Sequence, residues 1–133
     1  MSSFAFVTHK EKFLLMLRDD KPTIPNPNCW SLLGGIDEPG ETPEQTLWRE
    51  LKEEANIDPL TTKLLWQIEN RWYYHINLPD NVLDTIKLGD EGQKLDFFNW
   101  DQLQGIQLTI LLTQMTKQRS KELIALLNSQ KEI

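Results

Sequence analysis

Short runs of apolar residues, separated by turn-forming residues, recur along most of the chain. The runs at residues 3–8 and 12–17 predict two strands of an antiparallel hairpin, joined by a polar turn at residues 9–11. Phe4 and Phe6 fall on one face of the first strand, which predicts packing in the core. Similar runs, rich in aromatic and branched residues, predict further strands at residues 30–33, 62–69, 72–78 and 94–100.

A helical spacing of apolar residues appears between the third and fourth of these strands. The stripe consists of residues four positions apart, Leu47, Leu51 and Ala55. Thr42 and Gln45 form a capping-box pattern at the start, and Asn56 suits the left-handed residue that ends a helix. The sequence therefore predicts a helix over residues 43–55.

The second half of the chain predicts a loop and a terminal helix. Residues 79–90 are polar and predict a mobile loop beside a substrate pocket, as residues 19–29 predict a loop rich in Pro and Asn. Asp101 is a candidate cap for a short helix, and residues 108–128 predict an amphipathic helix, broken at 117–120. We expect the terminal helix to pack on the sheet or against a second copy, so the protein is a monomer or a homodimer.

Length and composition set limits on the class of protein. The 133 residues predict one domain spanning residues 1–133, with a sheet covered by helices. The formal net charge of −6 argues against binding a nucleic-acid polymer, because there is no basic excess to displace counterions. Small phosphorylated ligands remain open, since a bound metal ion reverses the charge locally.

Cysteine and hydropathy patterns indicate a cytoplasmic location. Cys29 is the only cysteine, so no internal disulfide can form, and we expect it to be a packing residue. There is no signal-type N-terminus and no apolar run of about 18 residues, so we expect no membrane association.

The helix over residues 43–55 carries an unusual density of carboxylates. Glu50, Glu53 and Glu54 fall within one arc of the helix. At a separation of about 6 Å, one like-charge pair costs about 0.7 kcal/mol in water but about 3 kcal/mol at an effective dielectric constant of about 20. A solvated acidic face is the simpler interpretation. The preceding loop favours a metal site instead, because it adds tight Gly turns and Glu41, and oxygen ligands without His or Cys suit Mg²⁺ or Mn²⁺.

The spacing of these residues resembles the Nudix box of the Nudix (MutT-type) hydrolases. Gly35 is followed by five residues, Glu41, seven residues and the run RELKEEANI at 49–57. The family usually has Gly where this chain has Asn56, and often has Pro where Leu33 stands. Asn is the next-best residue for a left-handed cap, so the first departure is mild. The resemblance implies an α/β fold, a Nudix α/β/α sandwich with a mixed sheet flanked by helices.

The resemblance also implies the roles of the acidic residues. Glu50, Glu53 and Glu54 would hold Mg²⁺ or Mn²⁺ directly or through water. The carbonyl of Gly34 would be a further ligand. Arg49 and Glu41 would orient these ligands. Glu91 would complete the metal site or act as the base, and the alternative base is one of the box glutamates.

Two candidate residues outside the box compete with simpler interpretations. Asp90 and Asp96 are alternatives to Glu91, and the whole EGQ segment is otherwise a charged loop. Similar proteins place a phosphate-contacting Arg near the end of the second strand, which makes Arg18 a candidate for substrate binding. The alternative is a surface ion pair of Arg18 with Asp19 or Asp20.

The expected activity is cleavage of the diphosphate bond in a nucleoside diphosphate linked to another moiety. The resemblance favours a MutT-type nucleoside triphosphate pyrophosphohydrolase, including action on oxidised purine nucleotides. Nucleotide-sugar or dinucleotide hydrolysis is the alternative, and so is a non-catalytic domain that binds a nucleotide or a partner. The intact set of box carboxylates favours an enzyme. Strand aromatics that could stack on a base are interpreted as packing residues: Trp66, Trp72, Tyr73 and Tyr74.

Overall fold

The computed structural model describes residues 1–129, and its centre is a mixed sheet of seven strands arranged around β1 (Ser2–His9). β1 pairs antiparallel with β2 (Lys12–Leu17) and with β4 (Leu33–Ile36), and parallel with β6 (Arg71–Asn77). The remaining strands extend the sheet outward: β3 (Trp30–Ser31) and β7 (Lys94–Phe98) beside β2, and β5 (Lys63–Ile68) beside β6. The predicted hairpin of β1 and β2 is confirmed.

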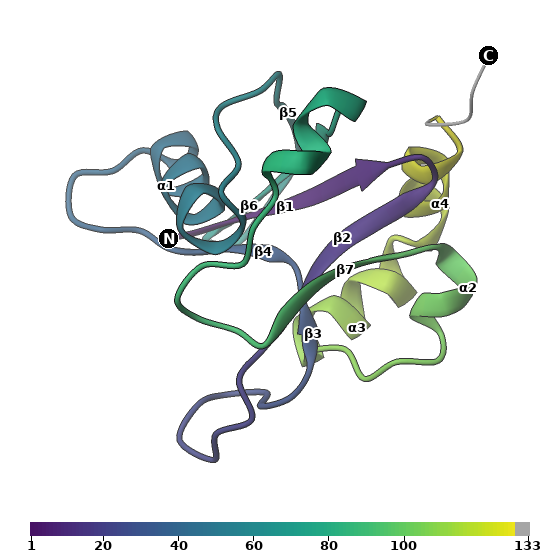
Figure 1. Ribbon diagram of the computed structural model, residues 1–133, viewed down its shortest axis with the longest axis horizontal. Coiled ribbons are helices and arrows are strands. Elements are labelled where there is room, and N and C mark those ends of the chain that lie inside the picture. Colours follow the sequence, from purple (N-terminus) through teal and green to yellow (C-terminus); the bar gives the residue numbers. More distant parts are fainter. Residues whose placement is uncertain (130–133) are drawn as a thin grey trace.

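Helices cover both faces of this sheet. Their bounds are α1 (Pro43–Ala55), the 3₁₀ helix η1 (Asp80–Thr85), α2 (Trp100–Leu103), α3 (Ile110–Gln118) and α4 (Ser120–Asn128). Figure 1 shows α1 at one end of the strands, next to the N-terminus, and α3 and α4 at the other end. The predicted α/β/α arrangement with a mixed sheet is confirmed.

The alternation of side chains along β1 divides the core into two clusters. Ala5 and Val7 point to the face covered by α1, where they pack with the helix stripe of Leu47, Leu51 and Ala55. Phe6 points to the opposite face and packs with residues of β2, α3 and α4, including Phe13, Leu112 and Leu123. The terminal helices therefore cover the sheet, as the sequence predicted, and Phe4 packs at the margin of the same cluster.

Local hydrogen bonds hold both ends of α1. The Thr42 hydroxyl accepts a hydrogen bond from the backbone N–H of Gln45 at 3.2 Å, and the Gln45 side chain accepts one from the backbone N–H of Thr42 at 2.9 Å. Asn56 has φ 58° at the C-terminal end, and its side-chain amide donates to the Thr85 carbonyl at 2.9 Å. The predicted capping box and left-handed cap are confirmed.

The structure differs from the sequence-based expectations around the glycine pair. The expected strand 30–33 is two strands, β3 and β4, and Gly34 and Gly35 lie inside β4 rather than in a turn. The cause is pairing with β1, which supplies the hydrogen-bond partners that an isolated Gly-Gly sequence lacks.

Two further differences lie in the second half of the chain. The expected loop 79–90 contains η1, and α2 is capped by Asn99 rather than Asp101, because the Asn99 side chain accepts from the Gln102 backbone N–H at 2.8 Å. The terminal helix begins at Ile110 after the Thr109 cap, and the predicted break lies at Arg119.

Cys29 is buried, as expected of a packing residue. Within residues 1–129, no helix has both the length and the apolar character needed to cross a membrane.

Asn56→Ala tests the departure at the end of α1. We expect a loss of about 1 to 2 kcal/mol in the free energy of unfolding, because Ala is strained at positive φ and cannot bond to Thr85. Asn56→Gly is the matched control and should change stability by less than about 1 kcal/mol. Glycine adopts positive φ without strain, and this gain offsets the lost hydrogen bond to Thr85. Urea unfolding measures both. Equal losses in the two variants would show that backbone conformation is not what Asn56 supplies.

Candidate active site

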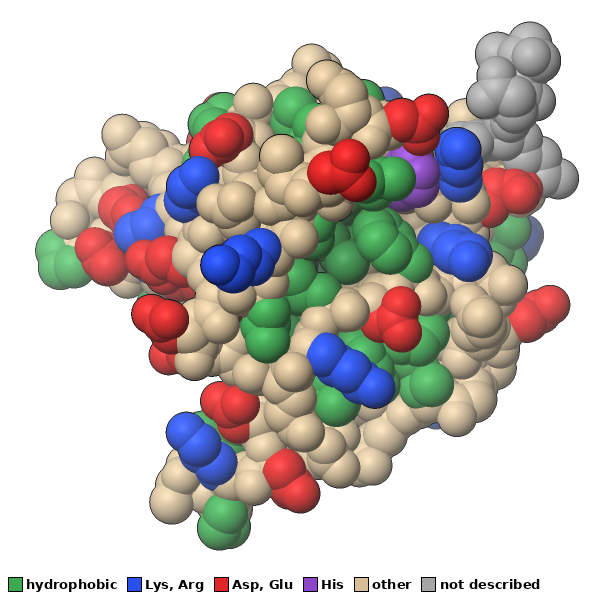
Figure 2. Space-filling view, in the orientation of Figure 1, with side chains coloured by type: hydrophobic (Ala, Val, Ile, Leu, Met, Phe, Trp, Pro, Cys, Tyr) green, Lys and Arg blue, Asp and Glu red, His purple; other side chains and the backbone are tan. Residues whose placement is uncertain are grey.

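The last two turns of α1 face a cavity that the segment before β7 closes from the other side. The cavity has a volume of about 430 Å³ and is lined by Glu50, Glu53, Glu54, Gly89, Asp90 and Glu91. Figure 2 shows acidic side chains gathered over the end of the molecule that carries α1. The structure thus brings the three helix carboxylates and Glu91 to the wall of one cavity.

Glu54 is the most perturbed carboxylate of the cavity. Its Oε1 accepts a hydrogen bond from the backbone N–H of Gly34 at 2.7 Å. Loss of hydration on burial, reinforced by the charges of Glu50 and Glu91, raises the pKa of Glu54 to about 8. In the described residues, no Lys or Arg pairs with Glu54, so its charge is compensated only by the Gly34 amide. Among the described residues, Glu54 is therefore a buried carboxyl group without a cationic side chain as its partner.

Arg49 organises the remaining acidic side chains. Its Nε donates to Glu41 Oε2 at 2.8 Å and its Nη2 donates to Glu41 Oε1 at 3.0 Å, a two-point contact. Its Nη1 donates to Glu50 at 2.9 Å and to Glu53 at 3.3 Å, and Nη2 also donates to the Ile36 carbonyl at 2.9 Å. One planar guanidinium thereby holds three carboxylates and the loop before the helix.

Arg49 lowers the pKa of both glutamates that it contacts most closely, but burial outweighs its effect at Glu50. The Arg49 hydrogen bonds hold the pKa of Glu41 down at about 2. Burial raises the pKa of Glu50, and its contact with Arg49 offsets part of that rise. The contact with Glu41 in turn raises the pKa of Arg49. Glu41 is therefore a permanent anion whose charge is used up by Arg49, whereas Glu50 remains available to a cation.

The carboxylate oxygens of this cavity suit a hard divalent ion, although two of the carboxylates, Glu50 and Glu53, contact Arg49. Glu50, Glu53, Glu54 and Glu91 are all oxygen donors on one cavity. No three His, Cys, Asp or Glu side chains among residues 1–129 already surround a common point as a metal site does. The physical reason is that Arg49 holds Glu50 and Glu53, and Gly34 holds Glu54.

The close packing of β4 against α1 depends on a glycine. A Cβ atom at Gly35 would lie 2.7 Å from the Glu50 carboxyl carbon and 2.8 Å from its Oε1. No larger residue fits unless Glu50 moves, so Gly35 allows β4 to pass directly against the carboxylate. Gly34, the predicted carbonyl ligand, lies beside Glu54 through its N–H.

The structure places Glu91 and its competitor Asp90 at the cavities and the other competitor, Asp96, away from them. Glu91 lines the acidic cavity and also the two cavities next to it, and its charge raises the pKa of both Glu50 and Glu54. Asp90 shares the acidic cavity. Asp96 lies in β7, accepts a hydrogen bond from its neighbour Phe97 at 2.8 Å, and lines none of these cavities.

A second cavity of about 470 Å³ adjoins the acidic one and shares Glu50, Glu54 and Glu91 with it. Arg18 is the cation of this cavity, and its Nε donates to the Pro25 carbonyl at 3.0 Å. Within residues 1–129 Arg18 forms no ion pair with Asp19 or Asp20, and Asp19 instead lies 3.9 Å from the Lys21 ammonium group. Sequence reasoning missed the apolar part of the wall: Phe4, Pro25, Leu32, Ile36, Leu111 and Leu112.

The side chains of this wall come from four separate regions of the chain, so no local spacing pattern predicts it. One long-range hydrogen bond ties two of these regions together: Asn26 Oδ1 accepts from the Ile110 N–H at 3.1 Å, which joins the loop after β2 to the start of α3. The strand aromatics pack in the core instead: Trp66 packs against Phe6 and Tyr73. The packing interpretation of these aromatics is supported by their absence from both cavity walls.

The comparison with known protein families agrees with this geometry. The NUDIX domain model matches residues 2–127. This chain belongs to the NUDIX domain family. A curated relative, the ADP-ribose pyrophosphatase of Methanocaldococcus jannaschii, is 32% identical to this NUDIX chain over an alignment of 99 residues that covers 69% of this chain and 57% of the relative. The match thus spans a little more than half of that relative's length.

Solved structures share the fold of this NUDIX domain. The MutT NUDIX hydrolase of Burkholderia pseudomallei superposes with a TM-score of 0.71 at 22% identity, covering 88% of this chain and 95% of that one. The NUDIX domain of NrtR from Shewanella oneidensis, complexed with ADP ribose, superposes with a TM-score of 0.70 at 19% identity, covering 92% and 86% of the two chains. At these identities the likeness establishes the fold alone.

The raised pKa of Glu54 predicts a pH-dependent stability of the metal-free protein. The folded state keeps the Glu54 proton up to about pH 8, whereas an unfolded Glu loses it near the ordinary value of 4.5. Folding is therefore favoured most at low pH, and the free energy of unfolding should fall by on the order of a few kcal/mol as the pH rises from about 5 to about 8. Glu54→Gln should remove most of this slope.

Urea unfolding in EDTA at several pH values measures this effect. Glu44→Gln, an exposed position in the first turn of α1, is the matched control and should keep the slope. A wild-type stability that rises between pH 5 and 8, or an unchanged slope in Glu54→Gln, would contradict the assigned titration.

Proposed function

We propose that this NUDIX domain is a Mg²⁺- or Mn²⁺-dependent pyrophosphohydrolase that cleaves the diphosphate bond of a nucleoside diphosphate linked to another moiety. The observation that carries the proposal is the sharing of Glu50, Glu54 and Glu91 by two adjoining cavities. One cavity is acidic, and the other has an apolar wall with Arg18 at its side. A diphosphate at the junction would lie beside the carboxylates while its nucleoside occupies the apolar cavity.

Divalent ions are the partners that the carboxylates require. Glu50, Glu53, Glu54 and Glu91 would hold them, with the Gly34 carbonyl as a further ligand. Burial, reinforced by neighbouring carboxylates, raises the pKa of Glu54, and a bound charge of at least +2 would favour its ionised form. When bound, such ions clamp phosphate oxygens, acidify a water molecule and neutralise the leaving group.

The protein's own residues supply position and proton transfer. Arg49 and Glu41 would orient Glu50 and Glu53, because their two-point contact is already formed in the free protein. A glutamate at the junction, Glu91 or Glu54, would accept the proton of the attacking water, since both lie on the wall shared by the cavities. Arg18 would contact a phosphate through the part of its guanidinium not used by Pro25.

The identity of the linked moiety is the finer part of the proposal. The GETPEQ run at residues 40–45 and the EGQ segment at residues 91–93 resemble those of MutT-type enzymes, which favours a nucleoside triphosphate, including oxidised purines. The curated relative at 32% identity is named an ADP-ribose pyrophosphatase, which makes ADP-ribose the second candidate. Both substrates place a diphosphate next to a nucleoside, so both fit the paired cavities.

Glu53→Gln tests the metal-holding role. We expect metal-dependent turnover to fall by at least about 100-fold, equivalent to about 3 kcal/mol of lost transition-state stabilisation. The fold should be kept, because Glu53 is 57% exposed and contributes one long contact to Arg49. Glu44→Gln, on the same helix outside both cavities, should retain wild-type turnover. Turnover of the Glu53 variant at the wild-type rate would refute the role.

A substrate panel with and without metal tests the class of reaction. Nucleoside triphosphates, oxidised dGTP, ADP-ribose, nucleotide sugars and dinucleoside polyphosphates are incubated with Mg²⁺, Mn²⁺ or EDTA, and phosphate-containing products are separated. We expect a nucleoside monophosphate among the products, and its formation should stop in EDTA. A nucleotide that raises the melting temperature without any turnover would instead favour a non-catalytic binding domain.

A further inference from the structure

The segment that carries Glu91 is attached to α1 on one side. The Lys87 N–H donates to the Ala55 carbonyl at 3.0 Å, and the Gly89 N–H donates to the Glu54 carbonyl at 3.1 Å. A Cβ atom at Gly89 would lie 1.8 Å from the Glu53 carbonyl oxygen, so only glycine fits against the end of the helix. These contacts set the position of residues 87–89 relative to the box glutamates.

On its other side the same segment is attached to the loop at residues 18–29 through Gln93. The Gln93 backbone N–H donates to the Leu17 carbonyl at 2.8 Å. Its side-chain Nε2 donates to the Arg18 carbonyl at 2.8 Å and to Asn28 Oδ1 at 2.9 Å. One amide group therefore bonds to the first residue of the loop and to a residue near its end.

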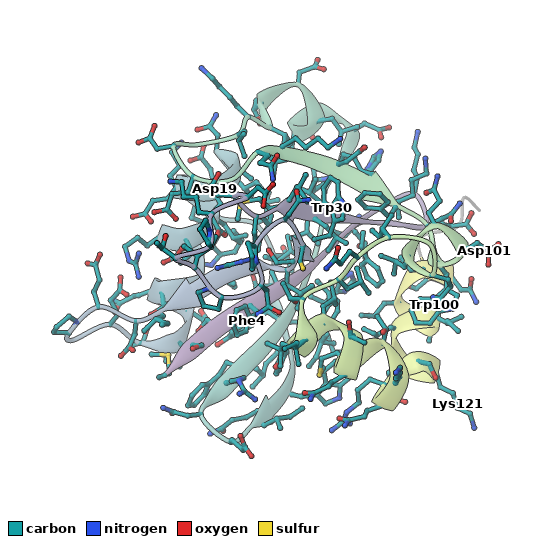
Figure 3. The ribbon with its side chains drawn as sticks, turned by 90° about the horizontal axis from the view of Figure 1, so that it is seen from below. Phe4, Asp19, Trp30, Trp100, Asp101 and Lys121 are labelled. Atoms are coloured by element: carbon teal, nitrogen blue, oxygen red, sulfur yellow. The ribbon has the colours of Figure 1, made fainter. Side chains whose placement is uncertain are left out.

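These bonds lie at the neck of a loop that forms part of the apolar cavity. The Arg18 N–H donates to the Cys29 carbonyl at 2.9 Å, and the Asn28 N–H donates to the Asp19 carbonyl at 3.1 Å, which closes the neck. Beyond it, Pro25 and Asn26 line the cavity together with Arg18. Figure 1 shows the segment before β7 passing from α1 to the base of this loop. In Figure 3, Asp19 at the start of this loop lies well away from Trp100 and Asp101 of α2.

We propose that Gln93 is a positioning residue that joins the loop at residues 18–29 to the Glu91 segment, so that the wall of the apolar cavity and the Glu91 carboxylate keep one relative position. The proposal rests on the proposed function, because it assigns Glu91 a part in the reaction. Gln93 itself contacts two protein acceptors and lines neither the acidic nor the apolar cavity.

The chemistry of the side chain explains why an amide is required. An amide nitrogen carries two N–H donors, which match the two acceptors, the Arg18 carbonyl and Asn28 Oδ1. A carboxylate of the same shape has no donor and would face both oxygens with a negative charge. Glu91 is exposed and lies two positions before Gln93. The hydrogen bonds of the Gln93 side chain therefore hold the backbone close to Glu91 in place.

Gln93→Ala and Gln93→Glu test the proposal by kinetics. We expect kcat to fall about tenfold or more in both variants, since misplacing a reacting group by a fraction of an ångström is costly. The melting temperature should change little, because Gln93 is exposed. Gln67→Ala and Gln67→Glu, on the exposed side of β5, are matched controls and should keep wild-type kcat. An unchanged kcat in both Gln93 variants would overturn the proposal.

A double-mutant cycle shows whether Gln93 acts through Glu91. In a Glu91→Gln background, Gln93→Ala should lower kcat by less than about twofold, because the group that Gln93 positions is already absent. A fall as large as that in the wild-type background would overturn the proposal, since Gln93 would then act on another group. Wild-type turnover by Glu91→Gln would overturn it equally.

Hydrogen exchange of the metal-free protein gives a test that does not depend on activity. Gln93→Ala should speed amide exchange in two separate stretches, residues 18–29 and residues 87–92, and Gln67→Ala should speed neither. Faster exchange confined to one stretch would overturn the coupling. If wild-type protein hydrolyses no substrate of the panel, the proposed function fails, while this exchange result still decides whether Gln93 joins the two segments.

Discussion

Repulsion among carboxylates at the end of α1 is the constraint on which the rest of the site depends. Glu50, Glu53, Glu54 and Glu91 line one cavity, and carboxylates this close together repel one another, most strongly where they are buried, unless cations offset their charge. Arg49 offsets part of it by contacting Glu41, Glu50 and Glu53. Among the described residues Glu54 has no such partner, and burial together with the neighbouring carboxylates raises its pKa. The fold thus gathers carboxylates at a site where only part of their charge is offset by Arg49.

The architecture around α1 exists to keep that centre in place. The apolar stripe of the helix is fully buried against the sheet, which fixes the rotation of α1 about its axis and therefore the direction of its acidic arc. β4 passes against this arc because Gly35 leaves room for Glu50. The Gly34 amide then meets Glu54, so a strand and a helix each contribute to a carboxylate that neither could position alone.

The junction of the acidic and apolar cavities is where segments far apart in sequence meet. The loop after β2 supplies Arg18 and Asn26, the start of α3 supplies Leu111, and the segment before β7 supplies Glu91. Gln93 donates two hydrogen bonds that connect the segment before β7 to the base of the loop. Asn26 accepts one from the Ile110 N–H, which connects the loop to the start of α3. Few buried apolar side chains hold the loops, so these polar contacts carry their placement.

The sequence by itself determined the features that depend on short spacing. The caps of α1, its apolar stripe and the common arc of Glu50, Glu53 and Glu54 all follow from helical periodicity, and they are found where that periodicity predicts. Most strand positions and the two-sided covering of the sheet also followed from apolar runs. The box spacing pointed to the family, and Glu91 was singled out by its EGQ context rather than by any contact.

Tertiary structure alone decided the features that depend on long-range contact. It placed Gly34 and Gly35 in a strand rather than a turn, because β1 supplies their hydrogen-bond partners. It gave Arg18 the Pro25 carbonyl in place of an acidic neighbour, and it assembled Phe4, Asn26 and Leu111 into one wall. Spacing along a chain reports which residues share a face of one element. Which elements face one another is set by packing and pairing across the whole sheet, and no local pattern records that.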